Sequence, residues 1–148
     1  MKKYLSKFIK NHYKTIFKSL IESKHENFSI NKIEIELIKN CKLGKAKDKI
    51  SLIPDEIVTP YVLKNKCWDY EIIKFIKKFK KKNDNIFLDI GSNVGLISKQ
   101  ILSSNLKIKK ILCFEPNQNS FECLKQNLSN NKIVNAYNFG LGLKTSNL

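Results

Sequence analysis

The sequence predicts an α/β fold in which a small parallel sheet alternates with helices, and three observations support this prediction. From residue 86 onward, short apolar runs alternate with stretches of helical periodicity. A turn containing two glycines links the first apolar run to the first of these helices, and an acidic residue follows the second run. Strands and helices in strict alternation indicate β-α-β units and therefore a parallel sheet.

The region before residue 84 is predicted to be a lysine-rich, mainly helical N-terminal extension. Residues 4–21 place apolar side chains at helical spacing with lysines on the other face, which predicts one amphipathic helix. We expect this helix to pack on protein. Adsorption to an anionic membrane surface is the alternative, since it needs the same pattern.

The rest of the extension shows weaker patterns. Residues 33–37 alternate between apolar and acidic side chains, which predicts a short half-exposed strand, and residues 39–49 resemble a loop. Residues 54–60 are bracketed by two prolines and are expected to be irregular. Residues 70–79 predict a helix whose end is rich in lysine, a charge that suits the negative end of the helix dipole.

Residues 84–148 are predicted to form the α/β domain itself. Its elements are expected as strands at 86–90, 111–114 and 133–139, with helices at 96–102 and 121–128 between them. This order is β-α-β-α-β, the first half of a doubly wound parallel sheet.

The net charge of +15 is less informative than its size implies, because all 28 basic residues are lysine. Arginine is the side chain that binds guanine and phosphate in a bidentate manner, so its absence argues against a dedicated nucleic-acid reader. Lysine, asparagine and isoleucine make up 65 of the 148 residues, a bias that AT-rich coding produces without selection for binding.

The sequence gives little support for a metal site, a catalytic histidine or a membrane-spanning segment. Cys41, Cys67, Cys113 and Cys123 contain no C-x-x-C pair, so we expect reduced thiols and no metal site. His12 and His25 lie far in sequence from the glycine turn and are assigned surface or packing roles. Lysines interrupt every apolar run near the N-terminus and no run reaches about 18 residues, so we expect a cytoplasmic protein with no transmembrane segment.

The feature that carries chemistry is the segment Asp89-Ile90-Gly91-Ser92-Asn93-Val94-Gly95, between the first predicted strand and helix. Ligands of open α/β sheets bind beyond the carboxyl ends of the strands, where glycines let a ligand approach the backbone and helix N-termini offer free N–H groups. A G-x-x-x-G turn alone is equally compatible with simple helix packing.

Glu115 strengthens the interpretation as a cofactor site. It ends the second predicted strand, 26 residues after Asp89, where a carboxylate can accept hydrogen bonds from both hydroxyls of a ribose. Taken alone, Glu115 could simply be an acid at a helix N-terminus and Asp89 a turn-forming residue. Their combination with two spaced glycines in β-α-β order favours a nucleoside-containing cofactor.

The glycine spacing favours S-adenosyl-L-methionine over a dinucleotide. A dinucleotide site uses G-x-G-x-x-G so that the backbone can contact a pyrophosphate, whereas Asn93 occupies the middle position here. Asp89 would repel a pyrophosphate but could bind the α-ammonium of a methionine moiety. The sequence therefore predicts a cofactor with an amino-acid tail.

These residues resemble a known family. Phe87-Leu88-Asp89-Ile90-Gly91-Ser92-Asn93-Val94-Gly95, then Phe114-Glu115-Pro116-Asn117, then Leu124-Lys125-Gln126-Asn127-Leu128 are similar to the FkbM-type methyltransferases, and Gly140-Leu141-Gly142 resembles the next block. The resemblance covers residues 84–148 and, more loosely, 59–79. It implies a Rossmann-like class I methyltransferase fold.

The resemblance also implies roles for individual residues. Asp89, Gly91, Ser92, Asn93 and Gly95 would line the methionine end of the cofactor, with Glu115 on the ribose and Asn117 near the adenosine. Ser92 stands where alanine is more usual. Transfer of a methyl group to a hydroxyl of a glycan, lipid or secondary metabolite is the implied reaction, and the catalytic base is not identified.

The family fold has about seven strands, whereas the sequence ends at Leu148, soon after the third predicted strand. We therefore expect a truncated chain that is inactive alone, or one that is completed by a second chain supplying the missing strands. A non-catalytic S-adenosylmethionine-binding module and an RNA methyltransferase fragment are the alternative functions.

Overall fold

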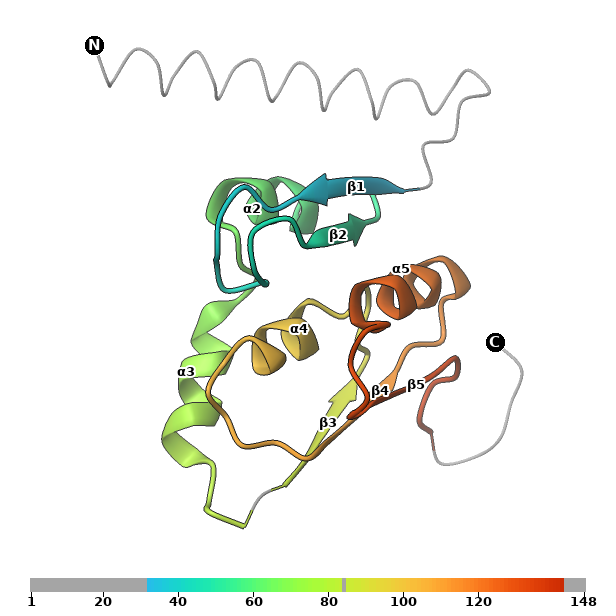
Figure 1. The fold of residues 1–148 in the computed structure, drawn as a ribbon. Coiled ribbons are helices and arrows are strands. Elements are labelled where there is room, and N and C mark those ends of the chain that lie inside the picture. The colour runs from blue at the N-terminus through green and yellow to red at the C-terminus, as the bar shows by residue number, and fades with distance from the viewer. Residues whose placement is uncertain (1–31, 84, 143–148) are drawn as a thin grey trace, which may run out of the picture. The chain divides into compact units, whose positions relative to one another are not determined.

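The computed structural model describes residues 32–83 and 85–142. These residues belong to one compact unit, Lys32–Leu148. Figure 1 shows their helices and strands in order along the chain. The amphipathic helix predicted at residues 4–21 lies outside the described residues.

A three-stranded parallel sheet forms the centre of the unit. Its strands are β3 (Ile86–Ile90), β4 (Lys110–Phe114) and β5 (Val134–Tyr137), which lie in the order β3-β4-β5. Helix α4 (Leu96–Leu102) connects β3 to β4, and α5 (Gln118–Leu128) connects β4 to β5. The predicted α/β class and parallel sheet are confirmed, and the bounds of β3 and α4 match the prediction.

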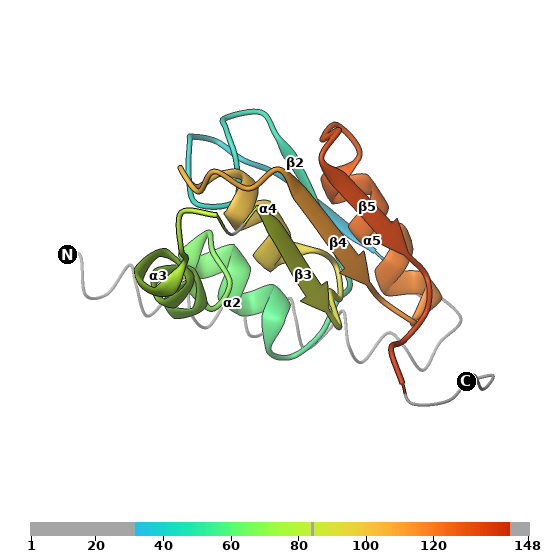
Figure 2. The same ribbon diagram turned by 90° about the horizontal axis from the view of Figure 1, so that it is seen from below.

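The two faces of the sheet differ. Helices α4 and α5 both cover one face, behind the strands in the view of Figure 2. On that face Ile111 and Cys113 are fully buried in a core with Ile101, Leu124 and Leu128. The opposite face carries three side chains of β3 that are 54–62% exposed (Ile86, Leu88 and Ile90) and a cluster of three aromatic rings (Phe114, Tyr137 and Phe139).

An antiparallel hairpin precedes the sheet in sequence. It consists of β1 (Ile33–Glu36) and β2 (Lys49–Leu52), which pair from Ile33 opposite Leu52 to Glu36 opposite Lys49. The strand at residues 33–37 was predicted, but β2 was not, and the prediction of a mainly helical extension is wrong for the described residues 32–83, which contain a hairpin as well as two helices. The residues of β2, Lys49-Ile50-Ser51-Leu52, alternate polar and apolar side chains, but four residues are too short a run to distinguish a strand from the loop that precedes it.

The hairpin packs on the α/β part of the unit. Leu37, Leu43 and Ile50 belong to one buried cluster with Leu96 of α4 and Cys123 of α5. Contacts therefore cross residue 83, where a division between extension and domain was predicted. The division of the chain into an extension and a domain at residue 83 stays a prediction.

Two helices follow the hairpin, and the first corrects a prediction. Helix α2 (Val58–Asn65) begins inside the segment expected to be irregular. Pro60 lies in its first turn, where the missing N–H has no intrahelical partner in any case. The Asp55 carboxylate accepts hydrogen bonds from the N–H groups of Ile57 and Val58 and so satisfies the helix start. The predicted helix at 70–79 is confirmed as α3 (Tyr70–Phe79), which packs against α4.

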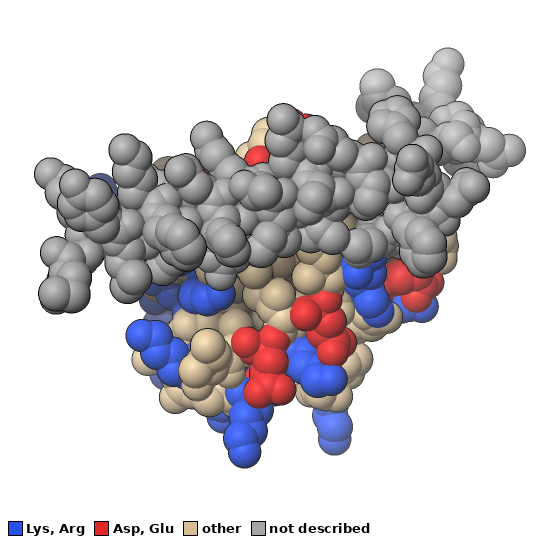
Figure 3. Space-filling view, turned by 90° about the horizontal axis from the view of Figure 1, so that it is seen from above, with Lys and Arg blue, Asp and Glu red and all other residues tan. Residues whose placement is uncertain are grey.

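The described surface mixes both signs of charge. In Figure 3 lysine and acidic side chains lie next to one another. No helix within residues 32–83 and 85–142 has both the length and the apolar character needed to cross a bilayer. All four cysteines are free thiols, and Cys67, Cys113 and Cys123 are buried.

Candidate functional site

The glycine turn joins the carboxyl end of β3 to the start of α4, as predicted from the sequence. It is held to the neighbouring strand, because the N–H groups of Gly91 and Ser92 both donate to the Phe114 carbonyl, at 2.9 and 3.0 Å. Gly91, Asn93 and Gly95 have φ values of +73°, +49° and +80°. The turn thus winds tightly at the edge of the sheet where ligands of such folds bind.

Glu115 lies beside this turn. Its Oε2 accepts a hydrogen bond from the Asn93 N–H at 2.8 Å, and its Oε1 accepts one from the Asn117 N–H, also at 2.8 Å. Glu115 is buried, with only 7% of its surface exposed. Each carboxylate oxygen has a second lone-pair direction, so the carboxylate can still accept hydrogen bonds from two hydroxyls.

Asn117 caps the next helix. Its side-chain Oδ1 accepts a hydrogen bond from the Ser120 N–H at 3.0 Å, at the N-terminus of α5. Asparagine is among the preferred residues at this position, so helix capping accounts for it without a ligand. Asn117 itself is exposed at the sheet edge, next to Glu115.

Asp89 points away from the turn, toward the covered face of the sheet. Its carboxylate accepts a hydrogen bond from the Ser98 hydroxyl of α4, and that hydroxyl is also 3.3 Å from the Cys113 sulfur. Burial raises the pKa of Asp89, and the hydrogen bonds from Ser98 offset only part of this effect. The Asp89 carboxylate is thus directed toward α4, and the contact with an α-ammonium predicted for Asp89 stays a prediction.

The two glycines have different surroundings. A Cβ on Gly91 would meet no atom within 4 Å, so the side of Gly91 that lacks a side chain faces open space. A Cβ on Gly95 would lie 3.1 Å from Leu128 Cδ1 and 3.4 Å from Leu124 Cγ. Gly91 therefore leaves room for a ligand, whereas Gly95 allows α5 to pack closely.

Ser92 is buried and works within the turn. Its hydroxyl donates to the Asp89 carbonyl at 2.6 Å and accepts from the Phe114 N–H at 3.1 Å. The structure thus brings Gly91, Ser92, Asn93, Glu115 and Asn117 together at one edge, while Asp89 and Gly95 face the core. The cofactor contacts predicted for all seven residues stay predictions.

Sequence reasoning assigned no structural role to three residues that hold this edge in place. Asn127 of α5 donates to the carbonyls of Val94 and Ser51 and accepts from the Ser51 N–H. Ser98 anchors Asp89, and Asn138 donates to the Glu115 carbonyl at 2.8 Å. A buried role for Asn127 could have been inferred, because it stands among Cys123, Leu124 and Leu128 on the apolar side of its helix.

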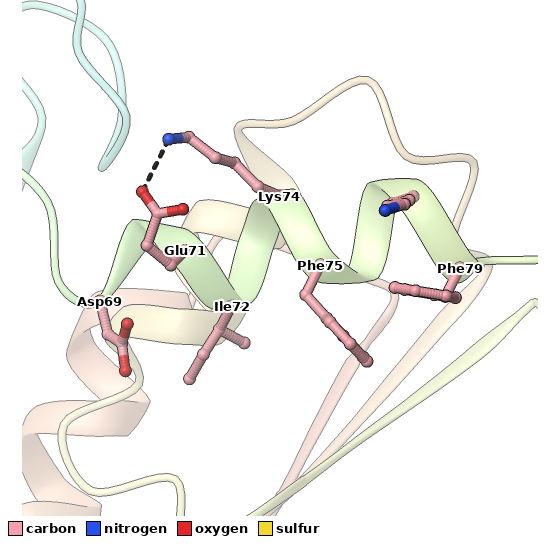
Figure 4. Close-up of a pocket in the computed structure, with 7 residues that line it drawn as sticks. Asp69, Glu71, Ile72, Lys74, Phe75 and Phe79 are labelled. Atoms are coloured by element: carbon pink, nitrogen blue, oxygen red, sulfur yellow. Dashed lines mark hydrogen bonds and ion pairs between the residues drawn. The ribbon is translucent and has the colours of Figure 1, made fainter.

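Two hollows in the described surface lie elsewhere. One, of about 540 Å³, runs along α3 (Figure 4), and the other, of about 370 Å³, lies near Lys42, Tyr70 and Asn105. Neither is lined by any of the predicted cofactor-binding residues.

Comparison with protein-family models, with curated proteins and with solved structures found no match for this chain. The resemblance to FkbM-type methyltransferases therefore rests on the residues quoted above.

Proposed function

We propose that the carboxyl edge of the β3-β4-β5 sheet binds S-adenosyl-L-methionine and that the chain is the cofactor-binding part of an FkbM-type, Rossmann-like methyltransferase. The observation that carries the proposal is the bond between the Glu115 carboxylate and the Asn93 N–H. It joins the acid after the second strand of the sheet to the glycine turn after the first, the two features that a nucleoside cofactor needs side by side.

The residues at this edge suit the two ends of the cofactor. Glu115 would accept hydrogen bonds from the ribose hydroxyls, and the open side of Gly91 would admit the methionine moiety against the backbone. Asn117 lies beside Glu115, where the adenosine would extend. In this proposal the affinity depends on Glu115 and the turn backbone, and Asp89 supports the turn from the core side.

When bound, S-adenosyl-L-methionine supplies an electrophilic methyl group on a sulfonium. The residues of this chain bind and orient it, since transfer of the group depends mainly on alignment of donor and acceptor. The acceptor that the family resemblance implies is a hydroxyl of a glycan, lipid or secondary metabolite. A cytoplasmic location belongs to the same proposal.

Calorimetric titration with S-adenosylhomocysteine tests the proposal. The 148-residue chain should bind, and Glu115→Gln should weaken binding at least tenfold, because hydrogen bonds to a charged acceptor are worth about 1.5–3 kcal/mol. Glu122→Gln is the matched control, since Glu122 pairs with Lys125 on the exposed side of α5 and should bind like the wild type.

Two results would count against the proposal: a folded chain that fails to bind S-adenosylhomocysteine, or equal affinity in Glu115→Gln and wild type. Tighter binding of NAD than of S-adenosylhomocysteine would assign the edge to a dinucleotide instead. Transfer of label from methyl-tritiated S-adenosylmethionine to a hydroxyl acceptor separates an enzyme from the alternative, a non-catalytic binding module.

A further inference from the structure

Helix α3 carries an apolar stripe that faces solvent. Ile72, Phe75 and Phe79 recur at helical spacing and are 41%, 62% and 57% exposed. Figure 4 shows the three side chains on the same side of the helix. The rings of Phe75 and Phe79 lie 4.5 Å apart, so they form one apolar surface. The core-facing side of α3 is separate and is centred on the fully buried Ile73.

Charge is distributed unequally along this helix. Asp69 and Glu71 stand at its N-terminal end, and Glu71 binds Lys74 at 2.6 Å. The C-terminal end, which carries Phe79, is rich in lysine: Lys77 and Lys78 precede Phe79, residues 80–82 are all lysine, and the Lys78 ammonium lies 5.4 Å from the centre of the Phe79 ring. The Phe79 ring therefore lies at the lysine-rich C-terminal end of the helix, with the Phe75 ring beside it.

The hollow at the stripe has only one wall. All seven residues that line it belong to α3 or are the adjoining Asp69. A single helix face can contact a flat bilayer surface as well as another helix, and Lys78 beside Phe79 favours an anionic surface. Aromatic side chains beside lysines on an amphipathic helix are the pattern that binds the headgroup region of anionic bilayers.

We propose that α3 is a membrane-surface contact. The rings of Phe75 and Phe79 insert into the interfacial region of an anionic bilayer, and Lys78 and the lysines that follow the helix bind the lipid headgroups. The contact is peripheral, because α3 has 10 residues, about half the length that spans a bilayer. It is independent of the cofactor site.

Sedimentation of the whole chain with vesicles tests this contact. The chain should bind vesicles containing phosphatidylserine, bind pure phosphatidylcholine weakly, and dissociate as salt is raised. Phe75→Ser/Phe79→Ser should lower the partition coefficient at least tenfold through lost apolar burial. Lys78→Gln/Lys82→Gln should also lower it at least tenfold, because each lysine near an anionic surface contributes about 1 kcal/mol.

Matched variants distinguish binding through α3 from nonspecific binding through other exposed apolar side chains or other charges. Ile38→Ser/Ile57→Ser removes two apolar side chains that are 94% and 72% exposed on other segments, and Lys39→Gln/Lys132→Gln removes two charges elsewhere. Both should bind vesicles within about twofold of the wild type. Circular dichroism confirms that each variant is folded.

Three results would overturn the proposal: no binding to anionic vesicles, equal binding to neutral vesicles, or a Phe75→Ser/Phe79→Ser variant that binds like the wild type. The last result would place any vesicle binding on other lysine-rich segments. Binding of an acidic amphipathic peptide to this surface without vesicle binding would assign it to a protein partner.

Discussion

Replacement of Asn127 by alanine should destabilise the fold more than any other single polar substitution discussed above. The Asn127 side chain is 3% exposed and makes three hydrogen bonds to backbone groups, at 2.7 to 2.8 Å. Two of these bonds hold Ser51 of the hairpin and the third holds Val94 of the glycine turn. The substitution therefore loosens two elements at once.

The magnitude follows from those three bonds. At about 1 kcal/mol for each net hydrogen bond, Asn127→Ala should lower the free energy of unfolding by about 3 kcal/mol. Asn127→Asp should lower it further, because a carboxylate would face the carbonyls of Ser51 and Val94. Asn119→Ala on the exposed side of the same helix is the control and should change stability by less than about 0.5 kcal/mol.

Urea denaturation followed by circular dichroism measures these differences. The reasoning would be refuted if Asn127→Ala unfolded at the same free energy as Asn119→Ala. It would also be refuted if Asn127→Asp were as stable as the wild type. Either result would mean that the hairpin and the glycine turn do not depend on the Asn127 side chain.

Further predictions concern the glycine turn and its acid. Gly91→Ala and Gly95→Ala share a backbone penalty of about 1 kcal/mol for positive φ. Gly95→Ala should lose about 1 kcal/mol more by urea denaturation, because its Cβ meets Leu128, and equal losses would contradict the packing described. Asp89→Asn should gain stability relative to the wild type as pH rises above the ordinary aspartate pKa of 3.8. The sign follows because burial raises the folded-state pKa, so the stability contributed by protonated Asp89 is lost as pH rises through that value. A difference that stays constant from pH 3 to pH 7 would contradict a buried, titrating Asp89.

The parallel sheet was predictable because its signals are local. The strand β3, the glycine turn and α4 stand consecutively in the sequence, and each has a distinct pattern. The strand β2 was missed, since its partner β1 lies across a 12-residue connection and its own alternation covers only four residues. The helix α2 was missed because Pro60 reads as a break, although Asp55 supplies a start signal.

In the candidate site, too, some features were predictable from the sequence and others were not. The pattern predicted that the glycine turn and Glu115 lie at one sheet edge, because parallel strands bring their carboxyl ends together. It could not predict that Asp89 turns toward Ser98, because that contact depends on how α4 packs across the sheet. Side-chain direction at a strand end is decided by tertiary packing.

The most direct test of the central claim is an amide chemical-shift map of the 17.2 kDa chain titrated with S-adenosylhomocysteine. The largest shifts should occur at Gly91, Asn93, Glu115 and Asn117, with smaller shifts at Ser98 and none along α3. Saturable shifts confined to α3 or to the hairpin, or no shifts at millimolar ligand, would contradict a cofactor site at the carboxyl edge of the sheet.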